Sequence, residues 1–182
     1  MSSDYAPGPA NGSLHDKSGE SWTFVLERKL RHPPARVWAA LTDPAQLREW
    51  APFDADGNLG VTGASVTLTT VGAPSPHATV TRIERADFPH LLEHDWGGSL
   101  IRWELEDYDG GTRLRLWASI DHRYIAMGAA GWHLCLDVLE HLIDGQPLGR
   151  MVGPPMLQHE GWQRLRAEYA ELFKNQESAS PA

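Results

Sequence analysis

The spacing of hydrophobic residues changes several times along the chain, and each change predicts a new structural element. From Ser21 apolar side chains occupy alternate positions (Trp22, Phe24 and Leu26), which predicts a β-strand with one buried face. Residues 32–50 then switch to helical spacing. Prolines stand where two helices would begin, and Asp43 precedes the second of them as an N-cap. We therefore predict two short helices in succession.

Residues 56–121 return to alternation, in runs divided by turn signals rich in glycine, proline and aspartate. The clearest strands are the last two, 101–107 and 112–120, in which apolar residues alternate with arginine and glutamate or with arginine alone. This pattern is typical of antiparallel strands with one buried and one solvated face. We predict an antiparallel meander.

The stretch from Ile125 to Asp144 predicts a long helix around which the other elements are arranged. Its ionisable residues form one narrow stripe. The rest of its surface is apolar or small, which indicates contact with a curved sheet or a cavity. We interpret the stripe as a solvated face made of His133, Asp137, Glu140, His141 and Asp144.

Glycines and prolines after the long helix predict an irregular crossing segment, followed by a final helix over 156–174 with its own apolar stripe. The two ends of the chain carry too little apolar content to offset the entropy of ordering them. We therefore predict disordered tails at 1–20 and 175–182 and a single folded domain over 21–174.

Composition and charge narrow the classes of partner. The chain carries 24 acidic and 16 basic residues, and its net charge of -8 does not suit a nucleic-acid phosphate backbone. No apolar run is long enough to span a membrane, and the first residues lack a secretion signal, so a cytoplasmic protein is expected. The single cysteine, Cys135, falls on the apolar side of the long helix and is interpreted as structural. Eight tryptophans suit both a core and a ligand-binding wall.

The order of several motifs resembles the proteins related to the activator of the Hsp90 ATPase, in the SRPBCC/START-like superfamily. The motifs are P-P-x-x-V-W-x-A-L-T-D-P-x-x-L-x-x-W at 33–50, G-T-x-L-x-L at 111–116 and G-W-H-x-x-L-D-x-L at 131–139. The resemblance implies an α+β helix-grip fold (START/Bet v 1-like), in which an antiparallel sheet wraps around a long C-terminal helix. A pair of short helices follows the first strand, and an extra helix ends the chain. This superfamily includes lipid and hormone binders, polyketide cyclases and co-chaperones, so the fold alone does not select a function.

A cavity between the sheet and the long helix is the expected ligand site in this fold. Large aromatic walls with few polar groups are what an apolar ligand requires, although core packing also accounts for most of these residues. His94 shares a strand face with Leu92 and Trp96, so it is either a core histidine or a polar contact for a ligand. The expected ligand-binding residues are Trp50, Phe53, His94, Trp103, Leu116, Trp132 and Leu136.

The sequence supports metal binding and catalysis less well than it supports ligand binding. The histidines and carboxylates of the long helix have residue types suited to metal binding or acid–base work, but we prefer the solvated face. His159-Glu160 begins like a zinc-protease motif, yet Gln163 stands where the second histidine ligand is required. Nucleotide-binding glycine motifs are absent. We expect no metal, no cofactor and no catalytic residue.

Three hypotheses about function remain. The leading one is non-catalytic binding of a small hydrophobic or aromatic molecule in the internal cavity. The alternatives are an interaction module that acts on an Hsp90-type chaperone, and a cyclase- or hydrolase-like enzyme, which needs converging ionisable groups in the same cavity. Besides the small molecule, the candidate partners are a chaperone and a second copy of the chain in a homodimer. Neither nucleic acid nor a membrane span is expected.

Overall fold

The computed structural model describes residues 5–18, 21–73, 75 and 77–179. Its strands are β1 (Ser13–Ser18), β2 (Ser21–Leu30), β3 (Phe53–Ala55), β4 (Ser65–Thr70), β5 (His77–Asp87), β6 (Leu91–Trp96), β7 (Ser99–Tyr108) and β8 (Gly111–Asp121). Its helices are α1 (Pro34–Thr42), α2 (Pro44–Trp50), the 3-10 turn η1 (His122–Tyr124), α3 (Ile125–Ile143), α4 (Pro154–Leu157) and α5 (Glu160–Ala179).

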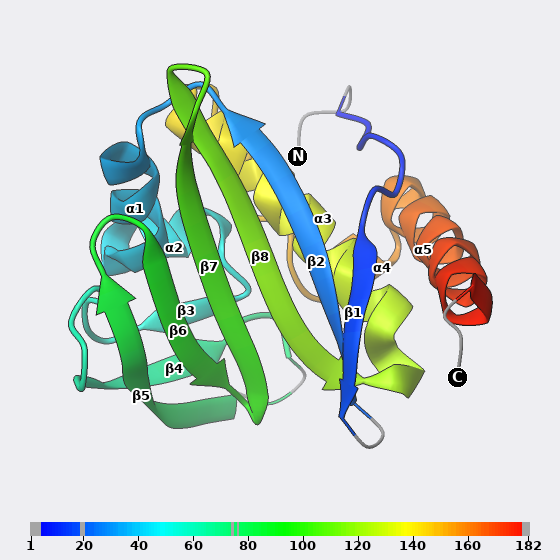
Figure 1. Ribbon diagram of the computed structural model, residues 1–182, viewed down its shortest axis with the longest axis horizontal. Coiled ribbons are helices and arrows are strands. Elements are labelled where there is room, and N and C mark those ends of the chain that lie inside the picture. The colour runs from blue at the N-terminus through cyan, green and yellow to red at the C-terminus, as the bar shows by residue number, and fades with distance from the viewer. Residues whose placement is uncertain (1–4, 19–20, 74, 76, 180–182) are drawn as a thin grey trace.

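Within these residues the eight strands form one antiparallel sheet, in the order β1-β2-β8-β7-β6-β5-β4-β3. The sheet wraps around α3, and the pair α1 and α2 covers one side of the molecule (Figure 1). The last helix, α5, packs along α3. This arrangement is the helix-grip fold, and it confirms the predicted fold class.

The alternation in β7 and β8 separates a dry face from a wet one, as predicted. Trp103 of β7 pairs with Leu116 of β8, and both side chains are buried on the face toward α3. On the opposite face Arg102 forms ion pairs with Glu93 and Glu104 at 2.6 and 2.7 Å. Ion pairs on the solvent-facing side of a sheet contribute little stability, so the buried face holds the sheet to the helix.

The helical pair begins where the sequence predicts. Asp43 caps α2, because its carboxylate accepts a hydrogen bond from the Ala45 backbone N–H at 2.9 Å. Trp50, at the end of α2, is buried and donates its indole N–H to the Ala40 carbonyl at 2.9 Å. This bond joins α1 to α2 and directs the indole into the core.

The long helix α3 is confirmed at 125–143. Its apolar arc is packed against the sheet and the helical pair, and residues such as Leu134, Val138 and Leu139 are almost fully buried. Despite this apolar character, no helix within the described ranges is both long and apolar enough to cross a membrane.

The ends of the chain are more ordered than predicted. Ser13–Ser18 is not a disordered tail but strand β1, which pairs with the edge of β2. The segment before it runs beside α5 (Figure 1), where the Ala10 backbone N–H donates to the Glu168 carboxylate at 2.9 Å. At the other end α5 stays helical through residue 179. An edge strand offers unpaired backbone groups, which an adjacent segment satisfies whatever its hydrophobicity. The other parts of the predicted tails, 1–4, 19–20 and 180–182, lie outside the described residues.

Candidate functional site

An apolar pocket of about 380 Å³ lies between α3, the ends of three strands and the segment that leads from α3 to α5. Strands β4, β6 and β8 each contribute a residue at or near their last position, and α3 contributes one side of the wall. The lining includes Thr70, Trp96, Met127, Gly131, Trp132, Cys135, Met156 and Trp162.

The crossing segment after α3 closes the pocket because it is fixed to β3 and to the turn after β4. The Arg150 guanidinium donates to the carbonyls of Ala51 and Phe53 at 2.6 and 2.7 Å. It also donates to the Asp54 carboxylate at 2.8 Å. Farther along the segment, Gly153 lies directly against Gly72, where a Cβ atom would come within 2.5 Å of the Gly153 Cα. Only glycine permits two backbones to approach this closely.

Aromatic rings connect the pocket with the core. Phe53 contacts the lining residue Trp96 with ring centroids 5.3 Å apart, and Trp96 meets Trp132 at 5.8 Å. The contacts continue inward on both sides, with edge-to-face geometry in each pair: His94 with Phe53 at 5.9 Å, Trp132 with Trp103 at 5.6 Å and Trp103 with Trp50 at 5.9 Å. Such contacts hold the rings in defined orientations. The inner wall of the pocket is therefore stiff.

The structure brings most of the predicted ligand-binding residues together, but only one of them reaches the pocket. Trp132 is a lining residue, whereas Trp50, Phe53, His94 and Trp103 form the ring contacts behind it. Two more predicted residues, Leu116 and Leu136, are fully buried in the core.

Several lining residues were missed by sequence reasoning. Trp96 could have been predicted from the alternation of its strand, because it shares a strand face with His94, which was predicted as a ligand-binding residue. Trp162 lies within the predicted final helix over 156–174, and the apolar stripe of that helix does not by itself reveal that it meets a pocket. Gly131 has no side chain, so no pattern marks it.

Polar atoms are few in the pocket wall. The Thr70 hydroxyl accepts a hydrogen bond from the Trp96 indole N–H at 3.3 Å. Burial raises the pKa of the Cys135 thiol to about 12, so the thiol stays protonated at neutral pH. The Trp162 Nε1 is buried and has no hydrogen-bond partner among the described residues. This surface suits a neutral, mostly apolar ligand.

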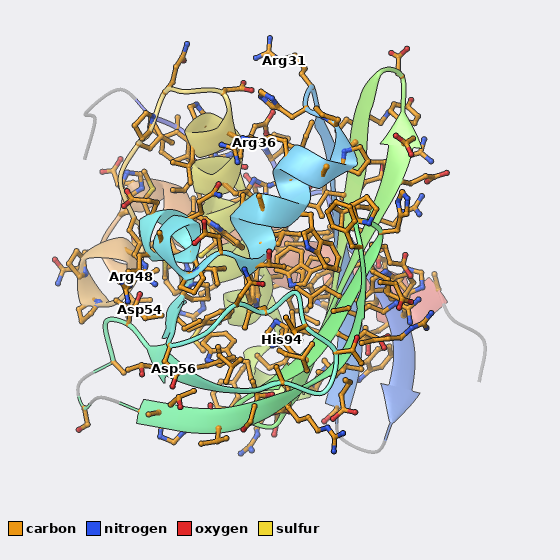
Figure 2. The ribbon with its side chains drawn as sticks, turned by 90° about the vertical axis from the view of Figure 1, so that its left-hand side faces the viewer. Arg31, Arg36, Arg48, Asp54, Asp56 and His94 are labelled. Atoms are coloured by element: carbon orange, nitrogen blue, oxygen red, sulfur yellow. The ribbon has the colours of Figure 1, made fainter. Side chains whose placement is uncertain are left out.

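His94 lies inside the molecule and is not a pocket residue (Figure 2). Its Nδ1 is 3.1 Å from the Asp95 carbonyl, which makes Nδ1 the protonated nitrogen of the neutral ring. Burial lowers the pKa of His94 below its usual value, so the ring is neutral. The other nitrogen, Nε2, has no partner among the described residues.

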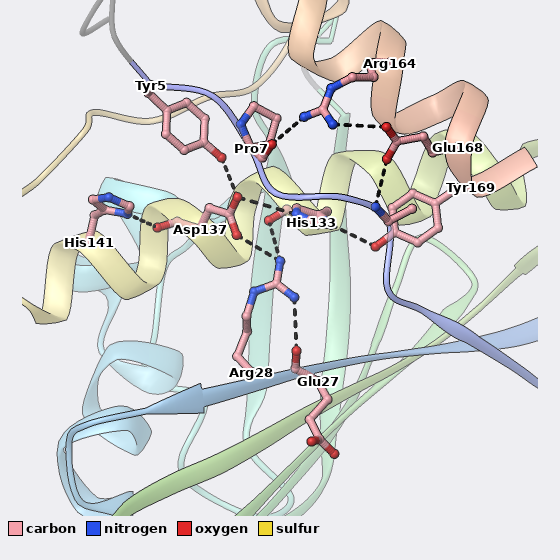
Figure 3. A network of polar contacts seen from close by, with 11 residues as sticks. Tyr5, Pro7, Glu27, Arg28, His133, Asp137, His141, Arg164, Glu168 and Tyr169 are labelled. Atoms are coloured by element: carbon pink, nitrogen blue, oxygen red, sulfur yellow. Dashed lines mark hydrogen bonds and ion pairs between the residues drawn. The ribbon is translucent and has the colours of Figure 1, made fainter. Parts of the chain in front are cut away.

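The polar stripe of α3 is solvated only in part, which corrects the sequence-based prediction at His133 and Asp137: Glu140, His141 and Asp144 remain partly exposed. His133 is 2% exposed, and its Nδ1 lies 2.8 Å from the Tyr169 hydroxyl of α5. Asp137 forms an ion pair with Arg28 of β2 at 2.9 Å and accepts a hydrogen bond from the Tyr5 hydroxyl (Figure 3). The N-terminal segment and α5 cover this face, and the periodicity of α3 cannot reveal a cover supplied by distant segments.

The charges in this network are set by burial. Desolvation, with Arg28 adding to it, lowers the pKa of His133 to about 4, so the imidazole is neutral near pH 7. Burial raises the pKa of Tyr169 to about 12. No group of three or more histidine, cysteine or acidic side chains among the described residues is arranged to hold a metal ion. The network residues do not line the apolar pocket, and their contacts are those of a structural joint between β2, α3 and α5.

Comparisons with known proteins place the chain by its family. The family model described as Activator of Hsp90 ATPase homolog 1-like protein matches residues 31–144, a span that contains both α1 and α3. No curated protein matches the chain.

Solved structures with the same fold come from several bacteria. A conserved protein of unknown function from Enterococcus faecalis has a TM-score of 0.67 and 16% identity, with 91% of each chain covered. CalU16 from Micromonospora echinospora has a TM-score of 0.62 and 22% identity, over 94% of this chain and 98% of that one. An AHSA1-like protein from Aeromonas hydrophila has a TM-score of 0.56 and 17% identity, over 68% and 92% of the two chains.

At these identities the solved structures show a common fold alone. The family match is the stronger finding, because it spans more than half of the sequence and includes the helical pair, the meander and the long helix. The chain belongs to the Activator of Hsp90 ATPase homolog 1-like family.

Proposed function

We propose that this protein binds a small hydrophobic or aromatic molecule in the pocket between α3 and the crossing segment, without chemical conversion. The observation that carries the proposal is the lining: three tryptophans and two methionines around about 380 Å³, with no charged side chain. Pockets for small molecules are commonly of this size or larger and are mostly apolar, with few polar groups. The two methionines, Met127 and Met156, are flexible enough to fit more than one ligand shape.

Binding is better supported than catalysis. A cyclase- or hydrolase-like reaction needs ionisable groups that converge on the substrate. Of the residues that line the pocket, Cys135 is the one that titrates, and its high pKa leaves it without nucleophilic thiolate. Burial of apolar ligand surface at about 25 cal/mol per Å², less the free energy of immobilising the ligand, corresponds to micromolar affinity.

A substitution at Gly131 tests the location of the site. A Cβ at Gly131 meets no heavy atom within 4 Å, so a side chain there grows into open space in the pocket. Leucine is also a better helix former than glycine. We expect Gly131→Leu to fold normally and to weaken binding of N-phenyl-1-naphthylamine at least tenfold, measured as the saturable rise of its fluorescence.

The matched control is Gly131→Ala, which brings the same gain in helix propensity but leaves most of the pocket open. This variant should bind the probe nearly as well as the unmodified protein. Equal affinity of the leucine variant and the unmodified protein would place the bound probe elsewhere and reject this pocket as the ligand site.

A chaperone-interaction module is the second candidate, and the family match is the observation that favours it. If it acts in this way, purified Hsp90 should be retained by the immobilised protein, and its ATPase rate should change when the protein is added. Absence of both effects would remove this candidate. Retention of both effects in Gly131→Leu would show that the chaperone contact is independent of the pocket.

A further inference from the structure

We infer that the ligand is an amphipathic anion: its apolar part fills the pocket, and its anionic group stays at the mouth, beside Arg166 and Lys174. This inference rests on the proposed ligand-binding function and specifies the chemical class of the ligand.

A second hollow, the charged groove, adjoins the mouth of the apolar pocket. It has a volume of about 540 Å³ and lies between the start of α3 and the middle of α5. Met127 lines both the groove and the pocket. Met127 and the lining residue Leu157 are 40% and 43% exposed, so they mark the mouth of the pocket. Arg166 lines the groove, and its guanidinium lies 5.7 Å from the ring centroid of Trp162 in the pocket wall. A ligand that extends from the pocket past Met127 therefore enters the groove.

The groove is more positive than negative, although the whole chain has a net charge of -8. The permanently charged cations and the carboxylate that line it are Arg123, Arg166, Lys174 and Glu177. Glu177 pairs with His122 at 2.7 Å, and Arg123 pairs with Asp121 at 2.8 Å. Arg166 and Lys174 are exposed and form no ion pair with the other residues that the structure describes. These two cations are therefore available to an anion that reaches the groove.

The pocket and the groove accept opposite ends of such a ligand. No lysine or arginine lines the pocket, and burying an unpaired anion in an apolar wall is strongly unfavourable. At the mouth the anion stays in contact with water and is attracted by both cations. A carboxylate at the end of an apolar chain or ring system satisfies both conditions, whereas a cationic amphiphile would be repelled at the mouth.

Two probes that differ in one group test the inference. Decanoate and decanol share an apolar chain, but only decanoate is charged at neutral pH. Each is titrated as a competitor of N-phenyl-1-naphthylamine, below the concentration at which it forms micelles. An exposed ion pair contributes up to about 1 kcal/mol, which is about fivefold in affinity. We expect Arg166→Gln to weaken binding of decanoate up to about fivefold more than binding of decanol.

The matched control is Arg82→Gln. Arg82 is exposed on β5 and does not line the groove, so this variant makes the same change in net charge at a distant position. It should weaken binding of neither compound. Lys174→Gln is the second variant, because Lys174 does not line the pocket and its loss leaves the wall intact. It should lower the affinity for decanoate relative to decanol in the same direction as Arg166→Gln.

Salt provides a measurement that needs no variant. In the unmodified protein, sodium chloride at about 1 M, where the Debye length is about 3 Å, should weaken decanoate relative to decanol. A ratio of the two affinities that neither variant changes would overturn the inference, with or without a salt effect, and would leave the binding function in place. Failure of the fluorescent probe and of both compounds to bind the unmodified protein would instead reject the proposed function, and this inference with it.

Discussion

Arg28→Met is expected to destabilise the protein by about 3–5 kcal/mol, a large part of the stability of a typical domain. The side chains of Arg28 and Asp137 are 10% and 14% exposed, and their ion pair joins β2 to α3. Without the guanidinium, the Asp137 carboxylate keeps the Tyr5 hydroxyl as a donor but loses its cation. An unpaired carboxylate at this depth must be desolvated or protonated, and both cost free energy. Urea unfolding followed by circular dichroism measures the effect.

Two further variants separate the buried charge from lost packing. In Arg28→Met with Asp137→Leu both charges are removed, so most of the lost stability should return. Arg115→Met, on the wet face of the sheet, removes a cation whose pair with Glu27 is much more exposed than the Arg28–Asp137 pair, so it should cost less than about 1 kcal/mol. If the double variant were no more stable than Arg28→Met, packing of the Arg28 stem would be the larger contribution.

Acidification from pH 7.5 to pH 5 is expected to remove about 2 kcal/mol of stability through His133 alone. The folded protein has a His133 pKa of about 4, below the ordinary value of 6.5 that applies to the unfolded chain. Between these values the unfolded chain binds a proton that the folded protein does not bind. Stability therefore falls as the pH drops below about 6.5 and levels off below the folded pKa near 4.

The groups that face His133 decide this direction. Burial, Arg28 and Arg164 disfavour the charged imidazolium form of His133. The carboxylates of Asp137 and Glu168 favour that form, but their effect is smaller than the effect of burial. His133→Gln is the control, because an amide can still meet the Tyr169 hydroxyl but does not titrate. The unmodified protein should lose about 2 kcal/mol more than this variant between the two pH values, in urea unfolding at each pH. His94 and the acidic residues titrate in both proteins, so their effects cancel. Equal losses would mean that His133 is protonated in the folded state.

The long helix α3 has two different faces. One face contributes Gly131, Trp132 and Cys135 to the apolar pocket, while the other carries His133 and Asp137 into the polar network. Substitutions in the network should therefore change the stability of the protein and leave probe affinity in the folded fraction unchanged. Substitutions in the pocket should do the reverse, and Gly131→Leu is the clearest example.

The sequence by itself determined the elements whose causes are local. Alternation set the inner and outer faces of β7 and β8, Asp43 marked the start of α2, and the apolar arc of α3 predicted its contact with the sheet. The motifs at 33–50, 111–116 and 131–139 predicted the family and its fold, and the family match confirms them. These features depend on the spacing of neighbouring residues, which can be read without coordinates.

Only the tertiary structure decided what covers each face. The stripe of α3 has the composition of a solvated surface, but Arg28, Tyr5 and Tyr169 reach it from segments distant in the sequence and satisfy its polar groups. Strand β1 forms through backbone hydrogen bonds to β2, and the apolar content of a segment does not predict such bonds. The pocket exists because the crossing segment packs against β3 and Gly72, and this places Trp162 in its wall. Burial and pairing between distant segments depend on the whole chain, so residue spacing alone does not determine them.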